Sequence, residues 1–140
     1  MSDLLQVALA GFVASLAWFI VGGALYMNPM AVKLYKSYEG SPGLKVWKNQ
    51  PKYLASMYLL GILLPTMILA VAYYYLQPVF SDGIVMPAIQ LGLILIGVRM
   101  IPRLIDMWIQ STYPGKLLVA EIVNGSILSF VGAAVLAWLL

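Results

Sequence analysis

The residues able to do chemistry are concentrated between positions 97 and 129 of a chain that is otherwise very apolar. The charged and amide side chains there are Arg99, Arg103, Asp106, Gln110, Lys116, Glu121 and Asn124. Arginines form charge-assisted hydrogen bonds with carboxylates, and an arginine that lacks an acidic neighbour can bind a phosphate or carboxylate group. These residue types therefore favour an ion-pair or anion-binding site.

Catalytic and metal chemistry have less support. The chain has no cysteine and no histidine, which excludes thiolate nucleophiles, histidine-dependent triads and the usual zinc sites. Asp106, Glu121 and Asn124 could hold a divalent ion, but the neighbouring arginines argue against it. We expect no metal, no cofactor and no enzymatic activity, and an intramembrane lipid-modifying enzyme is the less favoured alternative.

The composition identifies the solvent that surrounds the chain. Of the 140 residues 63% are apolar and only 9% are charged, whereas soluble domains are about 25% charged. A membrane-spanning helix needs ~20 apolar residues. The sequence predicts an all-α, polytopic integral membrane protein with one domain, residues 1–140, and four transmembrane helices at about 4–26, 52–76, 85–111 and 117–140. The lysines are too few to favour nucleic-acid binding.

The loop at 27–51 is basic and begins with a helix-start signal. Asn28 can cap a short helix that has Pro29 in its first turn. Five lysines follow, at positions 33, 36, 45, 48 and 52, and lysines interleaved with aromatic residues are typical of an interfacial segment. All eight basic residues fall on one side of four alternating spans. The positive-inside rule then predicts a cytoplasmic loop and both termini extracytoplasmic.

The last two spans are expected to form an antiparallel hairpin around Pro114 that encloses the polar residues. At 100° per residue Arg99, Arg103 and Asp106 share one helix face. We expect Arg103 to pair with Glu121, with Asp106 nearby, within roughly two turns of the cytoplasmic interface. The residues expected to bind an anionic lipid headgroup are Arg99, Arg103, Lys116 and Asn124. Two other interpretations remain open: the arginines anchor the helix at the interface, or they contact another subunit.

Small residues at four-residue spacing predict close helix packing in the first and last spans. They are Gly11, Ser15, Gly125, Ser129 and Ala133. Two further predictions concern prolines inside spans, at Pro65 and Pro102, where we expect kinks. The function that these features favour is a small accessory or oligomeric membrane protein that binds anionic lipid or a partner membrane protein, as a homo-oligomer or as a subunit of a larger complex. The alternative is a transporter or channel protomer with a polar pathway between subunits.

Two stretches resemble one protein family. The first span runs into Gly22-Gly23-Ala24-Leu25-Tyr26-Met27-Asn28-Pro29-Met30, and the final hairpin begins Tyr113-Pro114-Gly115-Lys116-Leu117. This pattern is similar to the four-span bacterial membrane family called the domain of unknown function seventeen-sixty-one, although Leu25 stands where that family usually has tryptophan. The resemblance implies a four-helix membrane protein and assigns no catalytic residue.

Overall fold

The structure, a computed structural model, describes residues 3–40 and 50–140, and every regular element in these two ranges is helical. Lys45 and Lys48 of the basic loop lie outside the described residues. In chain order the elements are α1 (Asp3–Met27), α2 (Pro29–Ser37), α3 (Gln50–Ser56), the π-helix η1 (Met57–Leu63), α4 (Leu64–Leu76), the 3₁₀ turn η2 (Gln77–Val79), α5 (Val85–Leu95), the π-helix η3 (Ile96–Met100), α6 (Ile101–Gln110) and α7 (Gly115–Leu139).

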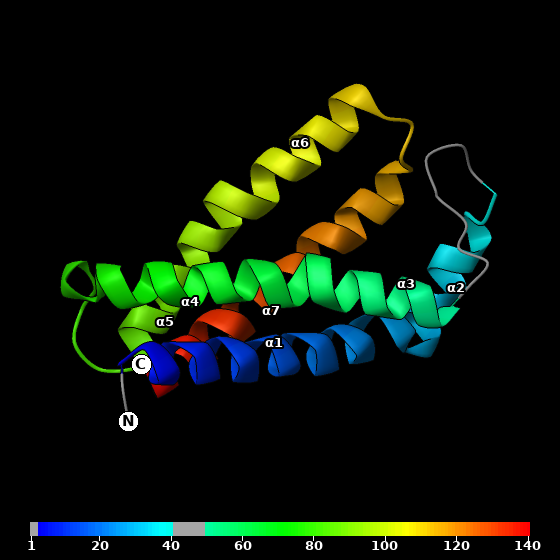
Figure 1. The fold of residues 1–140 in the computed structure, drawn as a ribbon. Coiled ribbons are helices and arrows are strands. Elements are labelled where there is room, and N and C mark those ends of the chain that lie inside the picture. Colours follow the sequence, from blue (N-terminus) through cyan, green and yellow to red (C-terminus); the bar gives the residue numbers. More distant parts are fainter. Residues whose placement is uncertain (1–2, 41–49) are drawn as a thin grey trace.

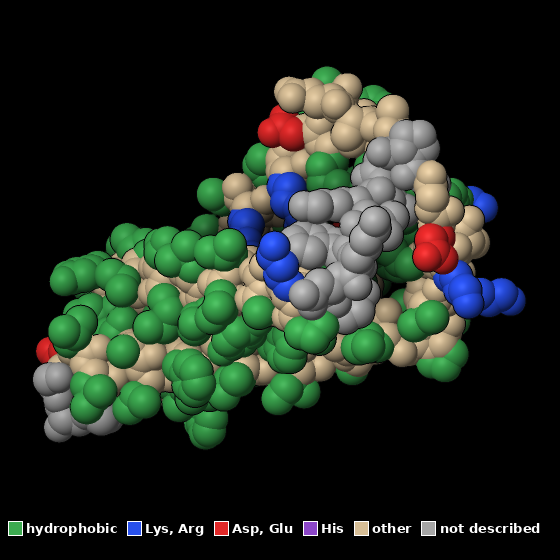
Figure 2. Space-filling view, turned by 45° about the vertical axis from the view of Figure 1, so that its right-hand side comes forward, with side chains coloured by type: hydrophobic (Ala, Val, Ile, Leu, Met, Phe, Trp, Pro, Cys, Tyr) green, Lys and Arg blue, Asp and Glu red, His purple; other side chains and the backbone are tan. Residues whose placement is uncertain are grey.

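Four of the resulting helical stretches are long and apolar enough to cross a membrane. They run over Asp3–Met27, Pro51–Val79, Val85–Gln110 and Gly115–Leu139. Large apolar side chains cover their outer surface, as the hydrophobic side chains in Figure 2 show, and Leu60 and Ile68 are more than 60% exposed. Such a surface is stable against lipid but not against water. The predicted all-α, four-span integral membrane protein is thus confirmed.

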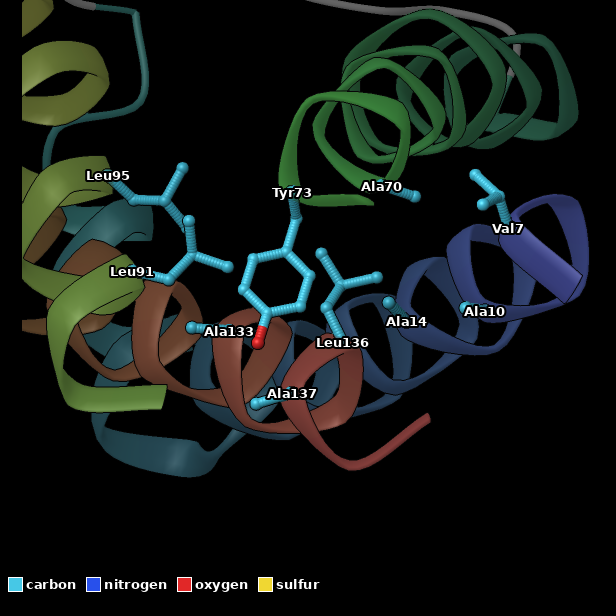
Figure 3. Close-up of a cluster of buried hydrophobic side chains, with 10 residues drawn as sticks. All are labelled: Val7, Ala10, Ala14, Ala70, Tyr73, Leu91, Leu95, Ala133, Leu136 and Ala137. Carbon is cyan, nitrogen blue, oxygen red and sulfur yellow. The ribbon is translucent and has the colours of Figure 1, made fainter. Parts of the chain in front are cut away.

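Helices α1 and α7 form the centre of the bundle. Helix α1 packs against both α4 and α7, and α7 also packs against α5. Their shared core at one end of the molecule is built mainly from small side chains of α1 and α7, with the Tyr73 ring of α4 pointing between α5 and α7 (Figure 3). Small residues allow the helix axes to approach closely, which is how helices associate where lipid removes the hydrophobic driving force.

The small residues of α1 and α7 are used in contacts within this chain. A Cβ added at Gly11 would come within 2.7 Å of the Met67 sulfur of α4, and one at Gly125 within 2.6 Å of the Met100 sulfur. Ser15, Ser129 and Ala133 are at most 3% exposed. The ridges predicted for close packing therefore face neighbouring helices of the same molecule.

Each of the two middle spans widens into a π-helix directly before its internal proline. Helix η1 ends two residues before Pro65, and η3 ends two residues before Pro102. Proline has no N–H and its ring collides with the carbonyl four residues earlier. A wider turn moves that carbonyl aside. The expected irregularities at Pro65 and Pro102 thus take the form of π-helical turns.

Helix α6 and the start of α7 leave the bundle together and project from it (Figure 1). They touch each other through a small apolar cluster of Met100, Leu104 and Leu118. Residues 111–114 connect them, with Pro114 directly before the first residue of α7. Arg99 lies in η3, directly before α6, and contacts α1 and η1, as described below.

Helix α2 is a separate short helix beyond the end of α1. The Asn28 side chain caps it by accepting a hydrogen bond from the Ala31 amide at 2.9 Å, and Pro29 occupies its first turn. Both features agree with the helix-start signal in the sequence. Lys33 and Lys36 are exposed on this helix, and Tyr35 is half-buried. The tyrosine is the residue that connects α2 to the candidate site.

Candidate functional site

Three tyrosine hydroxyls surround the carboxylate of Glu121, which lies on the second turn of α7. The hydroxyl of Tyr26 donates to Oε2 at 2.8 Å, and that of Tyr35 donates to Oε1 at 2.9 Å. The hydroxyl of Tyr113 approaches Oε1 at 3.5 Å. We call these four residues the tyrosine–Glu121 cluster. It joins the end of α1, helix α2, the loop before α7 and α7 itself at one point.

The cluster affects the tyrosines that lie outside the spanning helices. Burial raises the pKa of Tyr35, and the negative charge and hydrogen bond of Glu121 raise it further. Burial also raises the pKa of Tyr113, again with Glu121 adding to the effect, while the neighbouring Tyr35 hydroxyl and the charge of Arg103 oppose it. Both hydroxyls consequently remain protonated, and able to donate, to a higher pH than a tyrosine in water.

Arg103 lies near this cluster but is not bonded to it. Among the described residues the hydrogen bonds to Glu121 come from tyrosines, so the ion pair expected between Arg103 and Glu121 is replaced by neutral donors. The charge of Arg103 still acts on the hydroxyls of Tyr26 and Tyr113. Its side chain is exposed, and within the described part of the chain its guanidinium has no ion pair or hydrogen bond. Of the two arginines, Arg103 is therefore the one without a bonded partner among the described residues.

Arg99 has partners within the chain, on two other helices. Its Cζ lies 4.8 Å from the centroid of the Trp18 ring of α1, a cation–π contact. Its Nη2 donates to the carbonyl of Gly61 in η1 at 3.4 Å. The sequence paired Arg103 with Glu121 and left Arg99 for an outside anion, whereas among the described residues Arg99 has bonded partners and Arg103 has none. The reason is a carbonyl of η1 that sequence spacing within the last hairpin could not reveal.

The Arg99 side chain is exposed, but its contacts place it far from the ends of the spans. Trp18 precedes the end of α1 by nine residues, Gly61 follows Pro51 by ten, and Arg99 precedes Gln110 by eleven. Each distance corresponds to about 15 Å of helix, or roughly three turns. This is deeper than the two turns that the sequence indicated. Arg103 is one turn closer to the helix end, where a long side chain can extend to the interface.

The remaining predicted site residues are distributed around α6 and the start of α7. The Asn124 side chain adjoins the Tyr26 hydroxyl and so belongs beside the tyrosine–Glu121 cluster. Asp106 and Gln110 are exposed on α6, and Asp106 has no ion pair among residues 3–40 and 50–140. Lys116 is exposed on the first turn of α7. Figure 2 shows Lys and Arg side chains gathered where α6 rises from the bundle. Within the described ranges, no three acidic, cysteine or histidine residues lie close enough together to hold a metal ion.

Sequence reasoning missed the tyrosines. Tyr26 and Tyr35 flank the Asn28-Pro29 turn, and Tyr113 precedes the last helix. Of the three, only Tyr35 was given a role, as one of the aromatic residues interleaved with lysines in an interfacial segment. The sequence did contain a signal. A glutamate inside an apolar span needs hydrogen-bond donors for its carboxylate, and Tyr26, Tyr35 and Tyr113 supply neutral donors near the same ends of the spans.

Helical fold and polar site together define a class, the four-span all-α integral membrane proteins with ionisable residues inside the bundle. Comparisons with protein-family models, with curated proteins and with solved structures find no match.

Proposed function

We propose that this chain is a non-enzymatic accessory protein of the bacterial inner membrane that binds the phosphate headgroup of an anionic lipid at Arg103. The observation that supports the proposal is the different bonding of the two arginines. Both arginines are exposed, but Arg99 contacts Trp18 and Gly61, whereas Arg103 has no bonded partner among the described residues. An unpaired ionisable group inside a span indicates a functional site.

A lipid phosphate suits the surroundings of Arg103. The residue lies seven positions before the end of the third span, or about 10 Å of helix, and an arginine side chain can extend toward the headgroup region. Guanidinium groups bind phosphate through two parallel hydrogen bonds. Arg99, on the same helix face, adds a second positive charge behind it. The nearby carboxylate of Glu121 is occupied by tyrosine hydroxyls and leaves Arg103 to the lipid.

The proposed orientation places the arginine site at the inner leaflet. The described lysines of α2, Lys33 and Lys36, and the pair Arg103 and Lys116 lie at the same end of the spans, and Asp3 and Asp82 at the other. Anionic lipids of the cytoplasmic leaflet attract such basic residues. Both termini are then extracytoplasmic.

Native mass spectrometry of the detergent-solubilised protein with added phosphatidylglycerol tests the headgroup proposal. Arg103→Gln removes both the charge and the paired N–H donors of the guanidinium, and we expect about tenfold weaker phosphatidylglycerol binding, as for the loss of one charge-assisted hydrogen-bonding group. Arg103→Lys retains the charge but not the paired donors, so its affinity should lie between those of the parent and of Arg103→Gln. Lys33→Gln, an equally exposed basic residue on α2, is the matched control and should bind like the parent protein.

Two results would overturn the proposal. Equal binding of phosphatidylglycerol by the parent and by Arg103→Gln would remove the lipid site. Stoichiometric copurification of a second membrane protein that crosslinks to position 103 through an acidic side chain would assign Arg103 to a subunit interface. The orientation is tested separately with single cysteines, because the chain has none of its own: Lys33→Cys should react with an impermeant maleimide only from the cytoplasmic side, and Asp82→Cys only from the opposite side.

A further inference from the structure

An apolar groove runs between α6 and the first half of α7, on the opposite side of α6 from the arginines. Its volume is about 590 Å³. The wall from η3 and α6 is formed by Ile96, Met100, Ile101, Leu104, Ile105 and Trp108. The wall from α7 is formed by Gly115, Leu118, Val119, Ile122 and Ser126. The hydroxyl of Ser126 donates to the Ile122 carbonyl of its own helix, so the groove offers no polar group that needs a partner.

The groove has the length of one membrane leaflet. From Gly115 to Ser126 it extends over eleven residues of α7, about 16 Å, and one half of the ~30 Å hydrocarbon core is about 15 Å thick. The Gly115 end lies at the turn between the last two spans, and the Ser126 end lies toward the middle of α7. A ligand in the groove would therefore extend from the interface to the membrane centre.

The side chains in the walls favour a flexible chain over a helix as the occupant. A second helix packs closely where small residues recur at four-residue spacing, but the walls are mostly branched or aromatic. The small ridges of α1 and α7 are already used inside this molecule, with Gly125 against Met100 and Gly11 against Met67. An acyl chain adapts to such an irregular apolar wall without close approach of two backbones.

A basic residue follows the interfacial end of the groove in the chain. Lys116 comes directly after the lining residue Gly115 and is exposed, and Trp108, which also lines the groove, is 72% exposed. An amphipathic aromatic residue and a lysine are typical neighbours of an anionic headgroup at the interface. Glu121 lies on another face of α7, where tyrosine hydroxyls hold it.

We infer that this groove is a lipid site, distinct from the one at Arg103, that holds one acyl chain of an anionic inner-leaflet phospholipid whose headgroup lies beside Lys116. This site goes beyond the proposed function, since it uses a different face of α6 and none of the same residues.

Photolabelling in vesicles made from phosphatidylcholine and a trace of tail-diazirine phosphatidylglycerol tests the inference. We expect labelling on the walls of the groove, concentrated near Met100 and Ser126 when the diazirine is close to the tail end. Ile122→Trp fills the groove and should reduce that labelling about tenfold. Ile127→Trp is the matched control: Ile122 and Ile127 are 45% and 41% exposed on the same helix, but only Ile122 lines the groove. Ile105→Trp fills the groove from α6 and replaces Ile122→Trp if that variant fails to fold.

The headgroup is tested by Lys116→Gln, which should abolish the preference of groove labelling for phosphatidylglycerol over an identical phosphatidylcholine probe. Three results would overturn the inference: equal labelling of Ile122→Trp and Ile127→Trp, a preference unchanged in Lys116→Gln, or crosslinks from the groove to a second copy of the chain. None of these readouts involves Arg103, so the groove and the arginine site can fail independently.

Discussion

The Arg99 guanidinium donates to the carbonyl of Gly61, and Pro65 explains why that carbonyl can accept. Residue 65 would ordinarily donate its amide to residue 61 in an α-helix, but proline has no N–H. The π-helix η1 ends just before Pro65, and Arg99 reaches Gly61 from a different span at 3.4 Å. A helix irregularity in the second span thus provides a polar contact for a charge in the third.

The cation–π contact between Arg99 and Trp18 predicts energetic coupling between α1 and the third span. In a double-mutant cycle with Trp18→Leu and Arg99→Met, we expect a coupling of about 1 kcal/mol, the value for cation–π pairs at exposed sites. The measurement is the free energy of unfolding in mixed micelles with increasing SDS. Strictly additive losses would contradict the contact.

Tyr35 is predicted to attach α2 to the bundle through Glu121. Tyr35→Phe removes one hydrogen bond to a carboxylate and should lower the free energy of unfolding by about 1.5–3 kcal/mol. Tyr38→Phe, three residues further along the chain and not bonded to Glu121, should change stability by less than about 0.5 kcal/mol. Equal effects of the two substitutions in the same SDS titration would show that the cluster does not hold α2.

The raised pKa of Tyr35 predicts loss of stability in alkaline solution. A tyrosine whose folded pKa lies above its ordinary value of 10.0 contributes stability that is fully present below that ordinary value and is lost as the pH rises toward the folded value. The SDS midpoint should therefore fall as the pH is raised from about 9 to about 12. In Tyr35→Phe the fall should be shallower, and parallel pH profiles for the parent and the variant would exclude this tyrosine as the source.

The sequence was sufficient for the architecture because the spans depend on composition and length alone. Apolar segments of at least 20 residues must be helical in lipid, whatever their neighbours are. The Asn28-Pro29 signal for α2 is equally local, since a cap needs only residues one turn away. The small residues at Gly11 and Gly125 marked surfaces of close packing, but not which helix would meet them.

The polar site could be predicted only in part because its partners come from distant elements. Spacing within the last hairpin placed Arg103 near Glu121, and the two are electrostatic neighbours of the same tyrosines. Spacing could not show that Tyr35, 86 residues earlier in the chain, would form the hydrogen bond to Glu121 that was expected of Arg103. Nor could it show that Gly61 would accept from Arg99, because that contact depends on how α1, η1 and η3 are arranged around one another.

Close contact between α1 and α7 predicts that Gly132 tolerates no side chain. A Cβ at this position would lie 2.8 Å from a carbon of the Trp18 ring, which is rigid and itself buried. Gly132→Ala should therefore destabilise the protein by about 1–3 kcal/mol, as overpacking does. Gly23→Ala is the control on α1: nothing lies within 4 Å of its added Cβ, so helix propensity should make it neutral or stabilising by up to ~1 kcal/mol. The Trp18 ring also forms the cation–π contact with Arg99. Gly132→Ala should therefore weaken the coupling energy measured between Trp18 and Arg99. An unchanged coupling energy in the Gly132→Ala background would mean that Gly132 does not hold the ring in place.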